Sequence, residues 1–220
     1  RSKGFAVTGS DRDRSQMTAS LEAHGIPVAS PQSAENLTRF SEDAPIGLVV
    51  YTAAVHADNP EFSAAKAAGI PMMTRAELLG QIMAQYQNSF AVAGTHGKTT
   101  TTAMLTFLLW SPENRPTVSI GAVDVQLGSN YQIGDSDTFI AEACEYTNSF
   151  LSLHPRVGII LNIEEDHLDF FKDLADIRAS FRRFAEQVQP DGALVIGADI
   201  ENLAELTDDL PCKNIVTFGF

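Results

Sequence analysis

The sequence predicts an α/β protein built on parallel sheets, and three observations support this prediction. Short apolar, β-branched runs alternate with helical stretches along the 220 residues. The composition, with 44% hydrophobic and 20% charged residues, is that of an ordinary globular chain with a real core. A polar break at residues 87–89 divides the chain, so we expect one α/β domain over residues 1–88 and a second over residues 89–220.

The first half contains strand-like and helical patterns in alternation. Strands are expected at residues 5–8, 48–51 and 70–72. Helices are expected over residues 13–24, 59–69 and 74–86. The second helix has the clearest start, because Asn59 is a good N-cap, Pro60 suits the first helical position and Glu61 suits the positive end of the helix dipole.

The second half repeats the alternation with stronger strands. Strands are expected at residues 90–93, 138–141, 157–161, 193–196 and 215–218. Helices are expected over residues 99–110 and 174–188. The continuous apolar character of the strands is typical of a parallel sheet that is covered on both faces.

The charge balance and the cysteine count exclude several classes of function. Lys plus Arg number 15 and Asp plus Glu number 28, which gives a formal charge of −13 and argues against binding to nucleic acid or anionic membranes. No apolar run reaches the ~20 residues of a membrane helix, and no signal peptide is visible. Two distant cysteines indicate neither a disulfide framework nor a zinc site, so we expect a cytoplasmic protein.

A glycine-rich segment is the most informative motif. A predicted strand ends at residue 93 and a predicted helix begins at residue 99, and between them lies a turn that can direct backbone N–H groups at a phosphate. Lys98 would reach the phosphates and the Thr99 hydroxyl would bind Mg²⁺. Val92 stands where the general pattern has its first glycine, so a simple glycine turn before a capped helix is the alternative. The candidate residues are Gly94, Thr95, His96, Gly97, Lys98, Thr99 and Thr100.

Acidic residues and a histidine follow two other predicted strands. Glu142 stands at the end of the 138–141 strand, and His167 follows the 157–161 strand. Ligands of open α/β sheets gather at the carboxyl ends of strands, where a carboxylate suits Mg²⁺. The alternatives are that Glu142 is a surface acid at the end of its strand and that His167 lies in a solvated loop. Cys144 is interpreted as a small packing residue, because Glu142 and Glu145 should raise the pKa of its thiol and make it unreactive.

Together these segments resemble the Mur ligase family, and within it the branch that adds alanine. The resemblance covers essentially the whole chain and rests on residues 94–102, 142–150 and 162–169, with support from residues 58–61, 69–71 and 75–77. It implies a Rossmann-like, UDP-binding domain over residues 1–88 and a P-loop ATPase-type domain over residues 89–220. Measured against the family, both domains are incomplete and a third is absent, so this chain is expected to be inactive alone.

The resemblance also implies an activity. Family members of this branch join L-alanine to the lactyl carboxylate of UDP-N-acetylmuramate through an acyl phosphate, at the expense of ATP, in peptidoglycan precursor synthesis. The implied alternatives are a sister ligase that attaches a recycled peptide to the same sugar, a P-loop small-molecule kinase, and a nucleotide-binding module without activity.

Residue roles follow from the same resemblance. Lys98 and the residues around it would hold the ATP phosphates, and Lys98 would be catalytic. Thr99 and Glu142 would hold one Mg²⁺, and His167 a second. The residues implied near the UDP part of the substrate are Asp11, Thr52 and Ala53, and Asn130 would contact either the sugar side of the substrate or the metal shell.

Overall fold

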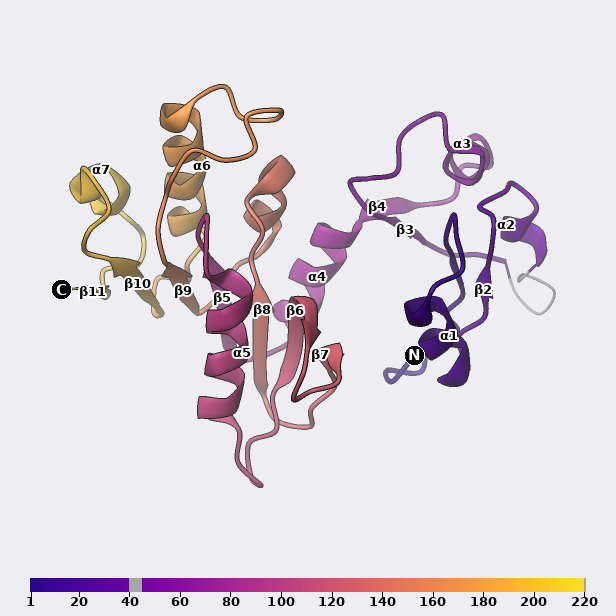
Figure 1. Cartoon of the computed structure of the whole chain (residues 1–220), viewed down its shortest axis with the longest axis horizontal. Coiled ribbons are helices and arrows are strands. Elements are labelled where there is room, and N and C mark those ends of the chain that lie inside the picture. Colours follow the sequence, from indigo (N-terminus) through magenta and orange to yellow (C-terminus); the bar gives the residue numbers. More distant parts are fainter. Residues whose placement is uncertain (40–44, 220) are drawn as a thin grey trace. The chain divides into compact units, whose positions relative to one another are not determined.

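The computed structural model describes residues 1–39 and 45–219, which form two compact α/β units, Arg1–Arg75 and Ala76–Phe220 (Figure 1). The α/β class expected from the sequence is confirmed. Among the described residues, no helix combines the length and apolar character needed to cross a membrane.

In its described residues, the first unit contains two short parallel strand pairs and three helices. Strand β1 (Gly9–Ser10) pairs with β2 (Val28–Ala29), and β3 (Val49–Tyr51) pairs with β4 (Met72–Thr74). The helices are α1 (Gln16–Ala23), α2 (Asn36–Arg39) and α3 (Pro60–Ala67). The expected cap of α3 is confirmed, because Asn59 Oδ1 accepts the N–H groups of Glu61 and Phe62 at 3.0 and 3.1 Å.

The strand expected at residues 5–8 is wrong in its position. The backbone ladder begins at Gly9, whose N–H donates to Pro27 O at 2.9 Å, and continues at Asp11, whose N–H donates to Ala29 O at 3.0 Å. Phe5 is 72% exposed and lies outside any strand. Apolar character alone does not form a strand, because the backbone groups also need a neighbouring strand to pair with.

The second unit is built on a sheet whose described strands have the order β11–β10–β9–β5–β8–β6–β7. Neighbours are parallel except β6 and β7, which form an antiparallel pair that the sequence did not predict. The strands are β5 (Asn88–Ala93), β6 (Thr117–Asp124), β7 (Ser129–Gln132), β8 (Thr138–Glu142), β9 (Val157–Ile160), β10 (Ala193–Gly197) and β11 (Ile215–Phe218). The helices are α4 (Arg75–Met83), α5 (Lys98–Leu109), α6 (Leu174–Glu186), α7 (Leu203–Thr207) and the 3₁₀ segment η1 (Tyr146–Ser152).

Alternating strand residues divide the core of the second unit into two layers. One layer joins α4, α6 and η1 to the sheet through a cluster that includes Met83, Phe139, Phe150, Phe181 and Phe184. The residues between them on the strands, such as Val92 and Ile140, are buried outside this cluster, and α5 contacts β5, β6 and β8 there. The sheet is therefore covered on both faces, as its apolar strands indicated.

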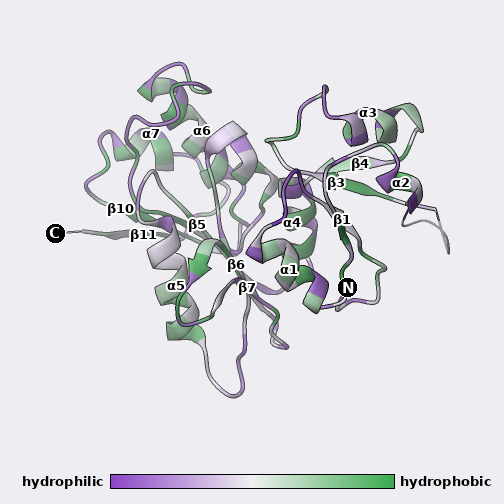
Figure 2. Ribbon diagram, turned by 45° about the vertical axis from the view of Figure 1, so that its right-hand side comes forward, coloured by the Kyte–Doolittle hydropathy of each residue, from purple (hydrophilic) through white to green (hydrophobic). Residues whose placement is uncertain are grey.

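Helix α5 changes character along its length. Its threonine-rich start is pale in Figure 2 and its second half is green. Thr102 and Thr106 are buried, whereas Met104 and Leu108 are 59% and 78% exposed. The helix therefore packs its small polar side chains inward and leaves apolar side chains in solvent.

Helix α4 packs with the second unit. Gly80 lies so close to η1 that an added Cβ would stand 2.0 Å from Ser152 O, and Met83 is fully buried in the core cluster. The two compact units therefore divide between Arg75 and Ala76, and the domain boundary expected after residue 88 stays a prediction.

Candidate active site

The candidate site lies where the chain leaves three adjacent parallel strands. In the sheet register Val92 of β5 pairs with Glu142 of β8, and Ala93 of β5 pairs with Ile160 of β9. The chain turns to β6, β7 and β8 on one side of β5 before it crosses to β9 on the other. Such a switch point, at the carboxyl ends of the strands, is where open α/β sheets bind ligands.

The loop between β5 and α5, residues 94–97, has a conformation that glycine permits. Gly94 and Gly97 have φ values of +144° and +82°, and Gly97 caps α5 without any side-chain hydrogen bond to the helix amides. Asn162, just after β9, holds this loop. Its side chain accepts from His96 N at 2.8 Å and donates to His96 O at 3.1 Å. The first amides of α5 are therefore presented, without a cap, beside a fixed turn.

Lys98, the first residue of α5, is folded back over the 94–97 loop. Its ammonium donates to Gly94 O at 2.7 Å, to Thr95 O at 3.1 Å and to Glu145 Oε1 at 3.0 Å. Glu145 Oε2 also lies 2.9 Å from Nζ, although it receives no hydrogen bond from the described residues. The side chains of Lys98 and Glu145 are 13% and 3% exposed, so this ion pair is largely removed from water.

A hydroxyl and a carboxylate meet beside Lys98. Thr99 Oγ1 donates to Glu142 Oε2 at 2.9 Å, and the same oxygen accepts the N–H of Gly121 in β6 at 2.7 Å. An added Cβ at Gly121 would lie 2.7 Å from Glu142 Oε1, so only glycine leaves room for this carboxylate. Glu142 is thus fixed from two sides in the place where a cation near Thr99 would be bound.

His167 joins the group through Glu145. Its Nε2 lies 3.9 Å from Glu145 Oε1 and 3.9 Å from Asp166 Oδ2, and its ring centroid lies 4.8 Å from that of Tyr146. The Tyr146 hydroxyl donates to Asp169 Oδ2 at 2.8 Å, which raises the pKa of Tyr146. The structure therefore brings together Lys98, Thr99, Glu142 and His167, which the sequence had placed on three separate strand ends.

Glu145 is the residue that sequence reasoning missed. The sequence assigns it no role beyond an effect on the pKa of Cys144, yet it contacts both Lys98 and His167. The signal in the sequence was a second acid three residues after Glu142. In the structure this acid lies in a segment that has buried neighbours. The pKa of the Cys144 thiol is raised, chiefly by partial desolvation and less by Glu145 and Glu142, the two carboxylates from which the expectation was drawn. Cys144 is exposed, however, so its interpretation as a packing residue is wrong.

The donor set fits Mg²⁺ rather than a metal held by protein groups alone. Thr99 and Glu142 offer hard oxygens in contact with each other. Within the described ranges, no three His, Cys, Asp or Glu side chains gather in a metal-binding cluster. Mg²⁺ normally binds one or two carboxylates and completes its coordination shell with phosphate and water. A site with Glu142 and Thr99 as its protein ligands would fit this preference.

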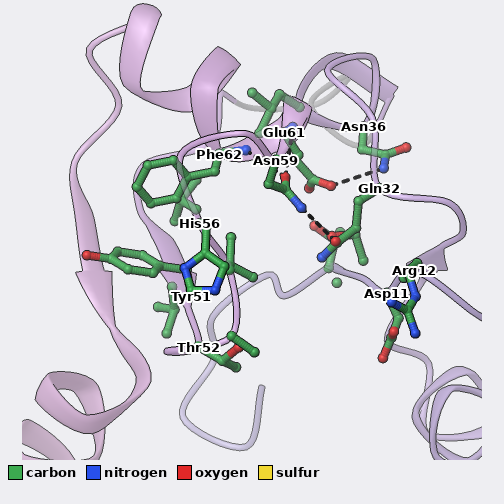
Figure 3. Close-up of a pocket in the computed structure, with 18 of the residues that line it drawn as sticks. Asp11, Arg12, Gln32, Asn36, Tyr51, Thr52, His56, Asn59, Glu61 and Phe62 are labelled. Atoms are coloured by element: carbon green, nitrogen blue, oxygen red, sulfur yellow. Dashed lines mark hydrogen bonds between the residues drawn. The ribbon is translucent and has the colours of Figure 1, made fainter. Parts of the chain in front are cut away.

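The remaining predicted residues are described within their own units. Asn130 is in β7, which β6 separates from β8, and it makes no hydrogen bond to the Lys98 group in the part of the chain described. Asp11 and Thr52 line a cavity of about 760 Å³ in the first unit (Figure 3). Ala53 is exposed and is not among the residues that line it.

The cavity of the first unit has a polar wall made of side-chain pairs. Asn36 Nδ2 donates to Glu61 Oε2 at 3.2 Å, and Asn59 Nδ2 donates to Gln32 Oε1 at 2.7 Å, as the dashed lines in Figure 3 show. Arg12 also lines it, and its guanidinium pairs with Asp13, which raises the pKa of Arg12. This wall offers carboxamide, carboxylate and guanidinium groups to one ligand.

Two family models together match nearly the whole chain. The model described as the Mur ligase middle domain matches residues 92–220, and that described as the Mur ligase family catalytic domain matches residues 1–87. The chain belongs to the Mur ligase family. The Lys98 site lies in the segment matched by the middle-domain model of this family.

Relatives within the Mur ligase family are similar over the whole chain. A UDP-N-acetylmuramate–L-alanine ligase of Lachnospira eligens is 54% identical over 218 residues, which are 99% of this chain and 46% of that protein. The enzyme of the same name from Agathobacter rectalis is 55% identical with the same coverage. The chain thus spans about half the length of the curated relatives that it matches, 46% in both cases.

Solved Mur ligase structures share the fold. A UDP-N-acetylmuramate–alanine ligase, MurC, from Thermotoga maritima has a TM-score of 0.82 and 32% identity, with 100% of this chain and 48% of that chain covered. A UDP-N-acetylmuramate:L-alanyl-γ-D-glutamyl-meso-diaminopimelate ligase from Neisseria meningitides has a TM-score of 0.88 and 27% identity, with 100% and 72% covered.

Proposed function

We propose that the protein carrying this chain joins L-alanine to UDP-N-acetylmuramate at the expense of ATP, in peptidoglycan precursor synthesis. The observation that supports this most is the 54–55% identity to relatives that bear the name of this ligase. Those relatives are about twice as long as the matched segment, since it covers 46% of them. The 220-residue chain by itself is therefore proposed to bind nucleotide without turnover.

The nucleotide is proposed to bind at the 94–97 loop. The uncapped amides of α5 and the Lys98 ammonium would hold its β- and γ-phosphates. Thr99 and Glu142 would hold Mg²⁺, and His167 would hold a second ion. When bound, Mg²⁺ would neutralise charge on the phosphates as they approach a carboxylate. The residues of this chain chiefly position the reactants and stabilise charge on the transferring phosphoryl group.

The chemistry explains why such a site is needed. A carboxylate is a poor acyl donor because its oxygen is a poor leaving group. In the proposed reaction the sugar's lactyl carboxylate attacks the γ-phosphate and displaces ADP. The amine of L-alanine then attacks the acyl phosphate, forms the amide bond and displaces inorganic phosphate. No covalent bond to the protein is required.

The UDP-sugar is proposed to bind in the first unit. The cavity lined by Asp11 and Thr52 has room for a large polar ligand, with a volume of about 760 Å³. The carboxamide pair Asn59–Gln32 offers groups that could pair with a base or a sugar hydroxyl. A cytoplasmic location is proposed together with this function.

The sister ligase, which adds a preformed peptide, is the second candidate. The fold similarity to the Neisseria enzyme, with its TM-score of 0.88, favours it. The sequence similarity favours the alanine ligase, because identity to that solved sister ligase is 27% against 54% for the Lachnospira relative.

Phosphate release distinguishes these candidates. The full-length protein is assayed with ATP, MgCl₂ and UDP-N-acetylmuramate, and either L-alanine or L-alanyl-γ-D-glutamyl-meso-diaminopimelate is added last. Release that requires both the sugar and L-alanine supports the proposal. Release only with the peptide identifies the sister ligase, and release without any amine indicates a kinase. Lys98→Ala serves as the inactive control.

A further inference from the structure

Glu145 is a buried carboxylate paired with Lys98. The residue is 2% exposed, and Lys98 Nζ lies 3.0 and 2.9 Å from its two oxygens. The other nearby basic group, His167 Nε2, stands at 3.9 Å. If Lys98 moved away, Glu145 would be left as a poorly paired charge in a poorly solvated place, which proteins avoid because of the desolvation cost.

The hydrogen-bond donors of the Lys98 ammonium are all in use in this arrangement. An ammonium has three N–H donors, and here they face Gly94 O, Thr95 O and Glu145. A phosphate therefore meets a lysine that is already fixed over the 94–97 loop and already neutralised. This differs from a phosphate loop in which the lysine is a free positive charge.

The formal charges around Lys98 disfavour the binding of a nucleotide without a divalent cation. Lys98 contributes one positive charge, while Glu145 and Glu142, which contact Lys98 and Thr99, contribute two negative ones. The amino end of α5 adds only about half a positive charge. At short range in a poorly solvated site such charges interact with little screening.

We propose that Glu145 is a positioning residue that fixes Lys98 over the loop and cancels its charge, so that the site admits a nucleotide only together with its divalent cation. This inference rests on the proposed binding of ATP at the 94–97 loop. It assigns the selection to Glu145, because Glu142 contacts Thr99, where the arriving cation would be held, whereas Glu145 contacts Lys98 itself.

Binding without turnover tests the proposal. The dissociation constant of AMP-PNP is measured by calorimetry on the full-length protein, with excess MgCl₂ and with excess EDTA. Wild type should bind far more tightly with MgCl₂. Glu145→Gln, which keeps the shape and removes the charge, should improve binding in EDTA by about tenfold and should change binding in MgCl₂ much less. Glu165→Gln removes an exposed acid from the neighbouring segment and should change neither constant.

Two results would overturn it. An unchanged affinity of Glu145→Gln in EDTA, in a variant that melts like wild type, removes Glu145 as the selecting residue. If that variant does not fold, Lys98→Met/Glu145→Gln replaces the buried pair by neutral side chains, which proteins often tolerate. Because the pair carries no net charge in either protein, its ratio of the two dissociation constants should equal that of wild type, and a ratio that differs several-fold contradicts the cancellation of the Lys98 charge by Glu145. Absence of binding by wild type in MgCl₂ would instead refute the proposed nucleotide site.

Discussion

Thr99 Oγ1 and Glu142 Oε2 stand 2.9 Å apart, so a hydroxyl from the first turn of α5 meets a carboxylate from the end of β8. The contact joins residues that are 43 positions apart in the sequence. It can form because β5 and β8 are parallel neighbours in register, which brings the start of α5 next to the last residue of β8. Both groups present oxygen atoms to the same point.

Loss of the Thr99 hydroxyl should impair catalysis and not folding. In Thr99→Val the oxygen proposed to bind Mg²⁺ is lost, and the proposed ADP-forming activity of the full-length protein should fall by about 100-fold or more. Thr99→Ser keeps the hydroxyl and should retain most activity. Thr101→Val, one half-turn further on, is the control for a changed threonine in this helix. Equal losses in the valine and serine variants would contradict a role for the oxygen.

Gly121→Ala should separate function from stability. An added Cβ would lie 2.7 and 2.8 Å from the two oxygens of Glu142, and the flexible end of that side chain can swing away from it. The free energy of unfolding should therefore change by less than about 1 kcal/mol, while Mg²⁺-dependent activity falls because Glu142 leaves Thr99. Gly47→Ala, with no atom within 4 Å of the added Cβ, is the control. Urea unfolding and phosphate release measure the two effects.

Gly94→Ala should damage the fold of the loop itself. Its φ is +144°, and the added Cβ would stand 2.9 Å from Leu161 Cβ and 3.2 Å from Leu161 N. Because backbone cannot retreat as a side chain can, the expected cost is about 2 kcal/mol or more. Gly128→Ala has a φ of +65° but nothing within 4 Å of the added Cβ, so it isolates the backbone cost, about 1 kcal/mol. Similar losses in the two variants would contradict a steric role for Leu161.

Tyr146 should stabilise the segment around His167 in a pH-dependent way. Its hydroxyl donates to Asp169, and this hydrogen bond raises the pKa of Tyr146. A raised pKa in the folded state means that the contribution is present below the unfolded value, about 10, and is lost as the pH rises through the folded value. The stability difference between wild type and Tyr146→Phe should therefore vanish in strong alkali. If the stability difference between wild type and Tyr146→Phe is unchanged in strong alkali, the hydrogen bond from the neutral hydroxyl to Asp169 is not its cause.

The fold could largely be predicted where local pattern and pairing agree. The apolar runs that became β5, β8, β9, β10 and β11 are continuous, and each found parallel neighbours. The run at residues 5–8 is equally apolar, but the pairing with Val28–Ala29 begins at Gly9. The β6–β7 pair was missed because its glycine and polar residues interrupt the alternation that marks a strand.

The site could be predicted in part for a similar reason. Lys98 and Thr99 lie in a local motif, and Glu142 and His167 stand at strand ends, where position alone suggests a role. Glu145 reaches Lys98 from a segment that leaves β8 and turns through Thr147 and Asn148, whose φ values are +54° and +59°. Left-handed conformations at two successive non-glycine residues are rare, so no sequence pattern indicated where that turn would place the carboxylate.

The packing of Gly80 against Ser152 O has a practical consequence for dissecting the protein. A cut after residue 88 would leave the second unit without Gly80 and Met83 and would uncover the apolar surface of its core. A cut in the peptide that joins Arg75 to Ala76 would keep that surface covered. Expression of residues 76–220 should accordingly yield soluble material more readily than expression of residues 89–220, even though the family models divide between residues 87 and 92.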